Sequence, residues 1–108
     1  MMSSSVGCIT TMEPFPGGAY GPSKAALNWL TKSLHAQGEE SGLIALAMHP
    51  GWVKTRAGEF VASEWKYEAG PPHSLEQSVG GMIKVIDGAT RESWGGKFVM
   101  FDGQELAW

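Results

Sequence analysis

The chain is organised around one short run of residues, Ala19-Tyr20-Gly21-Pro22-Ser23-Lys24-Ala25-Ala26-Leu27. Tyr20 and Lys24 are four residues apart in a stretch that is predicted to be helical, so the phenol and the ammonium share one helix face. A cation beside a phenol favours the phenolate, and such a pair is able to exchange a proton with a carbonyl or an alcohol. The same spacing also arises by chance, as a packed tyrosine beside a solvated lysine.

The helix that carries this pair is predicted to run from about Tyr20 to Gln37. Pro22 fits only in a first helical turn, and Gly38 supplies the stop. Three leucines repeat at helical spacing inside these bounds: Leu27, Leu30 and Leu34.

A second helix is predicted from about Leu75 to Gly88. The sequence Ser74-Leu75-Glu76-Gln77 is typical of a capping box. Four apolar residues follow at helical spacing: Val79, Met82, Ile83 and Ile86. Gly80 and Gly81 weaken the helix and indicate close packing on a sheet.

Strands are predicted on either side of this second helix. Leu43 to Met48 is a continuous apolar run bounded by Gly42 and Pro50, as expected of a buried parallel strand. Residues 95–101 are predicted to form a last strand that ends at Asp102-Gly103. A strand remnant at the N-terminus completes a strand, helix, strand, helix, strand order, which predicts an α/β fold with about three neighbouring parallel strands and flanking helices.

Composition excludes several classes of function. The 108 residues carry a net charge of −3, with eight basic and eleven acidic side chains scattered along the chain, so we expect no nucleic-acid partner. No apolar run approaches the roughly 20 residues that span a bilayer, so we expect no membrane partner and a cytoplasmic location. Cys8 is the only cysteine and is predicted to be a small buried hydrophobe. The three histidines are isolated from other ligands, so no metal site is predicted.

Two further motifs flank the Tyr20 helix, namely Ser3-Ser4-Ser5-Val6-Gly7 before it and Pro50-Gly51-Trp52-Val53-Lys54-Thr55 after the first strand. Their order resembles the catalytic half of the short-chain dehydrogenase/reductases. The gap of 16 residues between Ser4 and Tyr20 resembles the carbonyl-reductase branch, which includes fungal ketoreductases of polyketide type.

This resemblance implies a role for each motif. Ser4 would hydrogen-bond the substrate carbonyl, with Ser5 and then Ser3 as the alternatives. Tyr20 would deliver the proton, and Lys24 would assist it and hold the nicotinamide ribose. The cofactor would be NADP or NAD, and the resemblance favours NADP. The other residues implied to contact it lie in the second motif: Pro50, Gly51, Val53 and Thr55.

Residues 56–72 have no clean period and are interpreted as a substrate lid with a short amphipathic helix. Trp52, Phe60, Trp65 and Tyr67 are predicted to line an apolar pocket for a bulky or aromatic ketone, although the same residues are equally typical of packing aromatics.

The resemblance implies a partial Rossmann-type doubly wound sheet, of which residues 1–108 form the second half. The Gly-rich turn that holds a dinucleotide pyrophosphate after a strand is not found in these residues. Two hypotheses follow. The chain is an NAD(P)-dependent oxidoreductase that interconverts a carbonyl and an alcohol, here truncated and inactive by itself. Alternatively, it is a catalytically silent fragment that forms a homo-oligomer or associates with a full-length relative.

Overall fold

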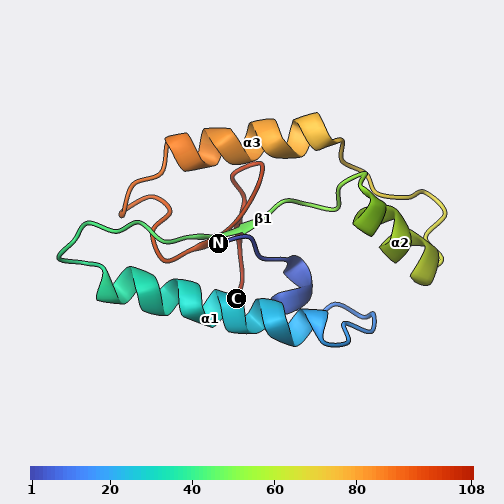
Figure 1. The fold of residues 1–108 in the computed structure, drawn as a ribbon, viewed down its shortest axis with the longest axis horizontal. Helices are drawn as coiled ribbons and strands as arrows, with labels where there is room; N and C mark the ends of the chain where they lie inside the picture. The colour runs from blue at the N-terminus through green and yellow to red at the C-terminus, as the bar shows by residue number, and fades with distance from the viewer.

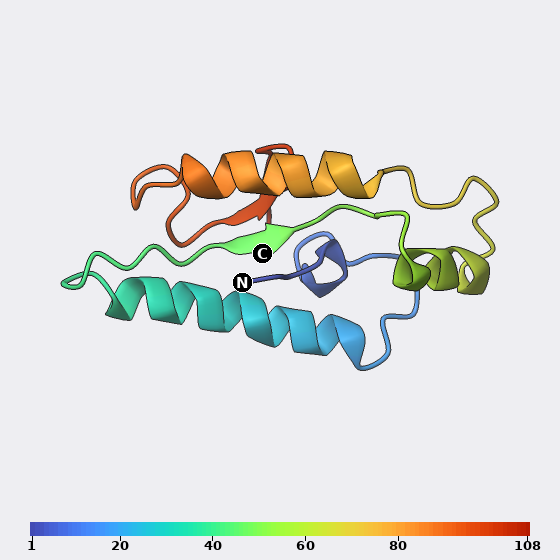
Figure 2. The ribbon, with the colours of Figure 1, turned by 45° about the horizontal axis from the view of Figure 1, so that its top comes forward.

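The computed structural model describes all residues from Met1 to Trp108. A small sheet lies between two helices, α1 (Tyr20–Gln37) on one side and α3 (Leu75–Asp87) on the other, as Figures 1 and 2 show. A third helix, α2 (Arg56–Glu64), lies at one end of the molecule (Figure 1). None of these helices combines the length and the apolar character needed to cross a membrane.

The sheet contains three short strands, β1 (Ala47–His49), β2 (Phe98–Met100) and β3 (Glu105–Leu106), in the order β1-β2-β3. The β1 and β2 strands are parallel, and Met2 adds a parallel bridge to Met48 on the other side of β1. These three segments are the parallel neighbours that the sequence predicts. The fold is therefore the partial Rossmann-type α/β arrangement that we expected.

The last strand, β3, is a feature that the sequence analysis missed. Asp102 and Gly103 end β2, as predicted, but they also reverse the chain so that β3 pairs antiparallel with β2. The Asp102 carboxylate accepts a hydrogen bond from the Gln104 amide at 3.0 Å, and Gly103 has a φ of +88° that favours glycine. Lys97 and Glu105 join the two strands by a 2.9 Å ion pair.

Helix bounds follow the predictions closely, whereas both predicted strands are shorter than predicted, and β2 covers only Phe98–Met100 of the predicted residues 95–101. Helix α1 has the predicted ends, and α3 begins with the predicted capping box. Strand β1 begins at Ala47 instead of Leu43, because Leu43 is used in the turn that ends α1, where its amide donates to the Gly38 carbonyl at 3.0 Å. The Arg91 guanidinium also donates to the Leu43 carbonyl, which holds this turn in place.

The core consists of two clusters on opposite faces of the sheet. Leu46, Met48 and Val99 pack with Val85 of α3 on one face. Ala47, Phe98 and Cys8 pack on the other face, so the predicted burial of Cys8 is confirmed. This division follows from the alternation of side chains along a strand. The sheet thereby fixes α3 and the N-terminal segment relative to one another.

Candidate active site

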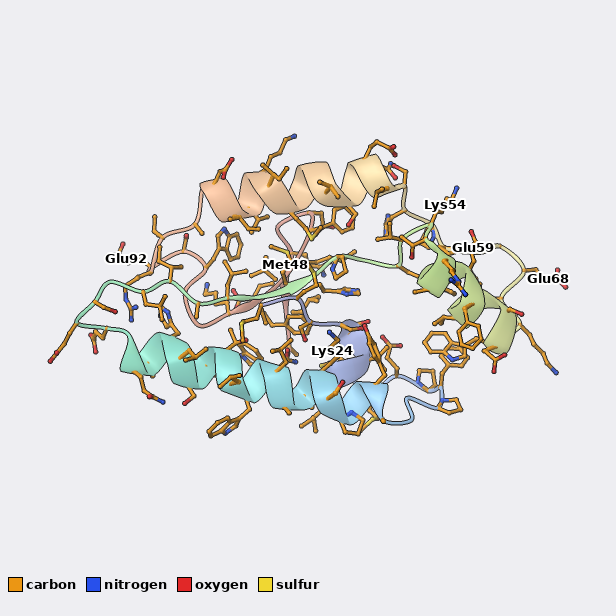
Figure 3. All side chains as sticks on the ribbon, viewed as in Figure 1. Lys24, Met48, Lys54, Glu59, Glu68 and Glu92 are labelled. Atoms are coloured by element: carbon orange, nitrogen blue, oxygen red, sulfur yellow. The ribbon has the colours of Figure 1, made fainter.

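The predicted proton-transfer pair lies at the start of α1. Tyr20 is the first residue of the helix, and the Lys24 ammonium lies 5.3 Å from the centroid of its ring. The predicted sharing of one face is therefore observed. The Tyr20 side chain is 54% exposed, so its phenol is open to a ligand. Figure 3 shows Lys24 next to the short helical turn η1 (Ser5–Gly7).

Lys24 is anchored to the N-terminal segment. Its ammonium donates a 2.9 Å hydrogen bond to the Met2 carbonyl, the residue that bridges to β1. An ammonium has three donors, so this bond leaves two for other acceptors. The cation is thus held at the junction of α1 and the sheet.

The three consecutive serines have different surroundings. The Ser3 hydroxyl is buried and donates to the Asn28 amide oxygen at 2.5 Å. Ser4 has extended backbone and caps η1, where its hydroxyl oxygen accepts from the Val6 amide at 3.3 Å. Ser4 is also buried, with 8% of its surface exposed. Because a hydroxyl both donates and accepts, the bond from Val6 leaves the Ser4 proton unused, whereas the Ser3 proton is donated to Asn28. This difference supports Ser4 over Ser3 as the carbonyl-binding serine.

Glycine at the end of the serine motif allows η1 to lie directly on α1. A Cβ atom at Gly7 would lie 2.6 Å from the Lys24 Cβ. On the facing side, a Cβ at Gly21 would lie 3.1 Å from the Val6 carbonyl oxygen. The two glycines therefore bring the serine segment against the turn of α1 that carries Tyr20 and Lys24.

The segment after β1 makes a sharp turn at Gly51. Gly51 has a φ of +78°, and a Cβ there would lie 2.8 Å from the Phe101 ring. The Pro50 carbonyl accepts a 2.7 Å hydrogen bond from the Ser78 hydroxyl of α3. The predicted cofactor motif is thus fastened to α3 and to the end of β2.

His49, at the end of β1, is a titratable residue that the sequence analysis did not select. Its Nδ1 atom is buried and has no hydrogen-bond partner. Burial lowers the pKa of His49, and His73 lowers it further, while Glu13 and Asp102 oppose the shift.

Val53 and Thr55 form the entry to α2. Val53 bridges to His73, and the Thr55 hydroxyl caps α2 by accepting from the Gly58 amide at 3.1 Å. Thr55 therefore has a structural task in addition to the cofactor contact predicted for it.

Four aromatic residues gather between the loop before α1 and the segment that contains α2. We call them the aromatic cluster: Phe15, Trp52, Trp65 and Tyr67. Phe15 stacks on Trp65 with ring centroids 4.4 Å apart, and Trp52 lies 5.1 Å from Tyr67 and 5.8 Å from Trp65. Three of the four predicted pocket residues, Trp52, Trp65 and Tyr67, are therefore brought together. Phe60 is 64% exposed on α2 and lies outside the cluster.

Phe15 was missed because it lies 37 residues before Trp52 in a loop without periodicity. No group of three or more histidine, cysteine, aspartate or glutamate side chains in the structure is arranged so that it could hold a metal ion.

Comparison with known proteins identifies the family. The chain is 42% identical over 114 residues to a short-chain dehydrogenase of Pyricularia oryzae. It is also 35% identical over 111 residues to norsolorinic acid ketoreductase of Dothistroma septosporum. These alignments cover 100% and 99% of this chain but only 44% and 40% of the two relatives. No family model matches the chain.

Solved structures give the same result. Carbonyl reductase Sniffer of D. melanogaster superimposes with a TM-score of 0.85 at 34% identity over 99% of this chain and 39% of its own. An NADPH-bound carbonyl reductase from chicken fatty liver superimposes with a TM-score of 0.77 at 32% identity, over 99% of this chain and 41% of its own. The chain belongs to the short-chain dehydrogenase/reductase family and spans less than half the length of these relatives.

Proposed function

We propose that this chain forms the carbonyl-binding and proton-transfer part of a nicotinamide-dependent reductase, which interconverts a carbonyl and an alcohol. The observation that carries the proposal is the Tyr20–Lys24 pair packed against the segment that bears Ser4. Relatives that are named as reductases and ketoreductases support it.

In the proposed reaction, the Ser4 hydroxyl donates a hydrogen bond to the carbonyl oxygen. Tyr20 transfers its phenolic proton to that oxygen as the carbonyl carbon gains a hydride, so that an alcohol and a tyrosinate result. Lys24 stabilises the tyrosinate through its positive charge. Solvent returns a proton to Tyr20, because the side chain is half exposed.

A nicotinamide cofactor, when bound, supplies the hydride. The donor set fits such a group: Lys24 has two N–H donors beyond its bond to Met2, and the exposed Tyr20 phenol lies beside it. Gly51, with its positive φ, lets the chain turn sharply after β1, and the Phe101 ring occupies the space that a Cβ would need there. We assign the ribose hydroxyls to Tyr20 and Lys24, and the nicotinamide to the segment from Pro50 to Thr55.

NADP is the cofactor that we favour over NAD. Two similar structures hold this cofactor: the chicken carbonyl reductase is bound to NADPH, and a short-chain dehydrogenase/reductase from Burkholderia multivorans is bound to NADP. For the substrate, the aromatic cluster favours a bulky or aromatic ketone, because aromatic faces stack on flat rings. The relative named norsolorinic acid ketoreductase is consistent with this class.

The test compares two polypeptides, residues 1–108 alone and a chimaera in which they follow the upstream portion of the Pyricularia oryzae relative. We expect NADPH-dependent reduction of 4-nitrobenzaldehyde by the chimaera and negligible turnover by residues 1–108 alone, because no Gly-rich turn follows a strand in these residues to hold the pyrophosphate. Saturable enhancement of NADPH fluorescence by the 108-residue chain would show cofactor binding without that turn.

Tyr20→Phe in the chimaera is expected to lower kcat by at least about 100-fold, because it removes the proton donor. The control is Thr31→Val, which also removes a hydroxyl from α1, but one that is bonded only to the Leu27 carbonyl within the helix. Full activity of the Tyr20 variant would reject Tyr20 as the donor.

A second candidate function is association with a full-length relative without catalysis. One observation favours it, an exposed apolar stripe along α3 formed by Leu75, Val79, Ile83 and Ile86. Sedimentation of the 108-residue chain with and without the Pyricularia oryzae relative tests this candidate, and Ile83→Lys should weaken any complex. A monomeric chain in both samples would reject it.

A further inference from the structure

Asn28 is a polar residue in an interior position of α1. It lies one turn after Lys24 on the same helix face, and only 4% of its surface is exposed. Buried amides are costly unless their hydrogen bonds are made. Its Oδ1 atom accepts from the Ser3 hydroxyl, whereas its Nδ2 atom is buried without a partner. An apolar side chain of similar size would avoid that cost, so stability alone does not explain an asparagine here.

The Asn28 bond is one of two side-chain links between α1 and the N-terminal segment. Asn28 holds the Ser3 hydroxyl at 2.5 Å, and Lys24 holds the Met2 carbonyl at 2.9 Å. These links connect adjacent residues of the segment with adjacent turns of the helix. A sliding movement of the segment along α1 would have to break both.

Ser3, which is bonded to Asn28, lies between Met2 and Ser4 in the chain. Met2 supplies the carbonyl that accepts the hydrogen bond from Lys24. The amide of Ser3 donates to the Met48 carbonyl at 2.7 Å, so the same residue is also fixed to β1. Ser3 therefore links β1 to α1, through its amide on one side and its hydroxyl on the other.

We propose that Asn28 is a positioning residue: by holding Ser3 it sets where the Ser4 hydroxyl and the Lys24 ammonium lie relative to Tyr20. The inference rests on the proposed reductase function for its catalytic consequence, but the positioning itself is a property of the folded chain. An error of about 1 Å in such an arrangement costs about 100-fold in rate.

The test uses two variants and a matched control. Asn28→Leu removes the link and leaves the Ser3 hydroxyl without its acceptor, which destabilises the fold. The double variant Ser3→Ala with Asn28→Leu removes both polar groups, and such paired replacement is close to neutral for stability. Thr31→Val is the control, because Thr31 is buried on the same helix but bonds only to the Leu27 carbonyl within it.

The first readout is the rate at which Lys24 is acetylated by acetic anhydride, measured by mass spectrometry on the 108-residue chain relative to Lys84 of α3. We expect the rate to rise about tenfold in the double variant, because a charge-assisted hydrogen bond to Met2 is weakened. It should stay at the wild-type value in Thr31→Val. Melting temperatures establish that the double variant is folded.

The second readout is kcat and KM of the chimaera with NADPH and 4-nitrobenzaldehyde. The double variant should lose about 100-fold in kcat with little change in KM, because the lost arrangement matters most in the transition state. A folded double variant with wild-type Lys24 acetylation and wild-type kcat would overturn the inference. If the wild-type chimaera has no turnover, the proposed function fails, and Lys24 acetylation alone decides the positioning role.

Discussion

Two glycines of this chain lead to opposite predictions for the same substitution. Gly7→Ala would place a Cβ 2.6 Å from the Lys24 Cβ and 2.7 Å from the Lys24 backbone carbon, so η1 must move off α1. We expect a loss of about 1–3 kcal/mol in the free energy of unfolding, the usual cost of overpacking. Urea denaturation followed by circular dichroism measures it.

Gly80→Ala is the matched control for this prediction. Gly80 lies inside α3, and a Cβ there would meet no atom within 4 Å. Alanine should stabilise this helix by about 0.5–1 kcal/mol relative to glycine. Equal effects at the two positions would contradict the close approach of η1 and α1.

His49 predicts how stability depends on pH. Burial holds its pKa below the ordinary value of 6.5 in the folded chain, so protonation favours the unfolded chain. Neutral His49 therefore makes its full contribution to the free energy of unfolding above pH 6.5, and this contribution decreases as the pH drops below that value. Thermal melts between pH 7.5 and pH 5 should show this decline, and His49→Gln should flatten it. If the melting temperatures of the wild-type chain and of His49→Gln changed equally with pH, His49 would have the same pKa in the folded and the unfolded chain.

At the level of elements, α3 shows how a local signal specifies a helix end. The Ser74 hydroxyl accepts from the Gln77 amide at 3.1 Å, and the Gln77 side chain accepts from the Ser74 amide at 2.9 Å. The capping box thus satisfies two amides that the first turn leaves unpaired.

Ser74→Ala should lower the free energy of unfolding by about 1 kcal/mol, the typical cost of a lost cap. The control is Ser63→Ala, which changes an exposed serine in the last turn of α2. Urea denaturation of both variants checks the difference, and an equal loss in the two would mean that the cap contributes nothing.

The end of α1 depends on a residue far from it in the chain. The Arg91 guanidinium donates to the carbonyls of His35 at 3.1 Å and Gly38 at 3.3 Å, which the helix end leaves without partners. Gly38 marks the stop in the sequence, but no local pattern indicates that an arginine 53 residues later completes it.

For the molecule as a whole, stability is concentrated in the middle of the sheet. Both core clusters flank β1 and β2, whereas α2 lies at one end of the molecule (Figure 1) and buries only Gly58 and Ala62. Regions with few buried contacts open at low free energy.

Amide hydrogen exchange should therefore be slowest in β1 and β2 and fastest in α2 and residues 65–72. Mass spectrometry of peptides after timed exchange checks this order. Protection of α2 equal to that of β1 would contradict the distribution of the core.

By itself, the amino-acid sequence determined the features that short stretches encode. Helical spacing, a capping box and a glycine stop act within a few residues, so the ends of α1 and the start of α3 were predictable. The order of the serine, Tyr20–Lys24 and Pro50-Gly51 motifs was sufficient to indicate the family.

Only the tertiary structure decided which distant residues meet. Asn28 and Ser3 are 25 residues apart, and their hydrogen bond exists because η1 packs on α1 through Gly7. Phe15 joins Trp65 through a loop without periodicity, while Phe60, apolar in the sequence, remains exposed. Local propensities act over a few residues, but these contacts depend on how separate elements pack, which no single stretch of sequence specifies.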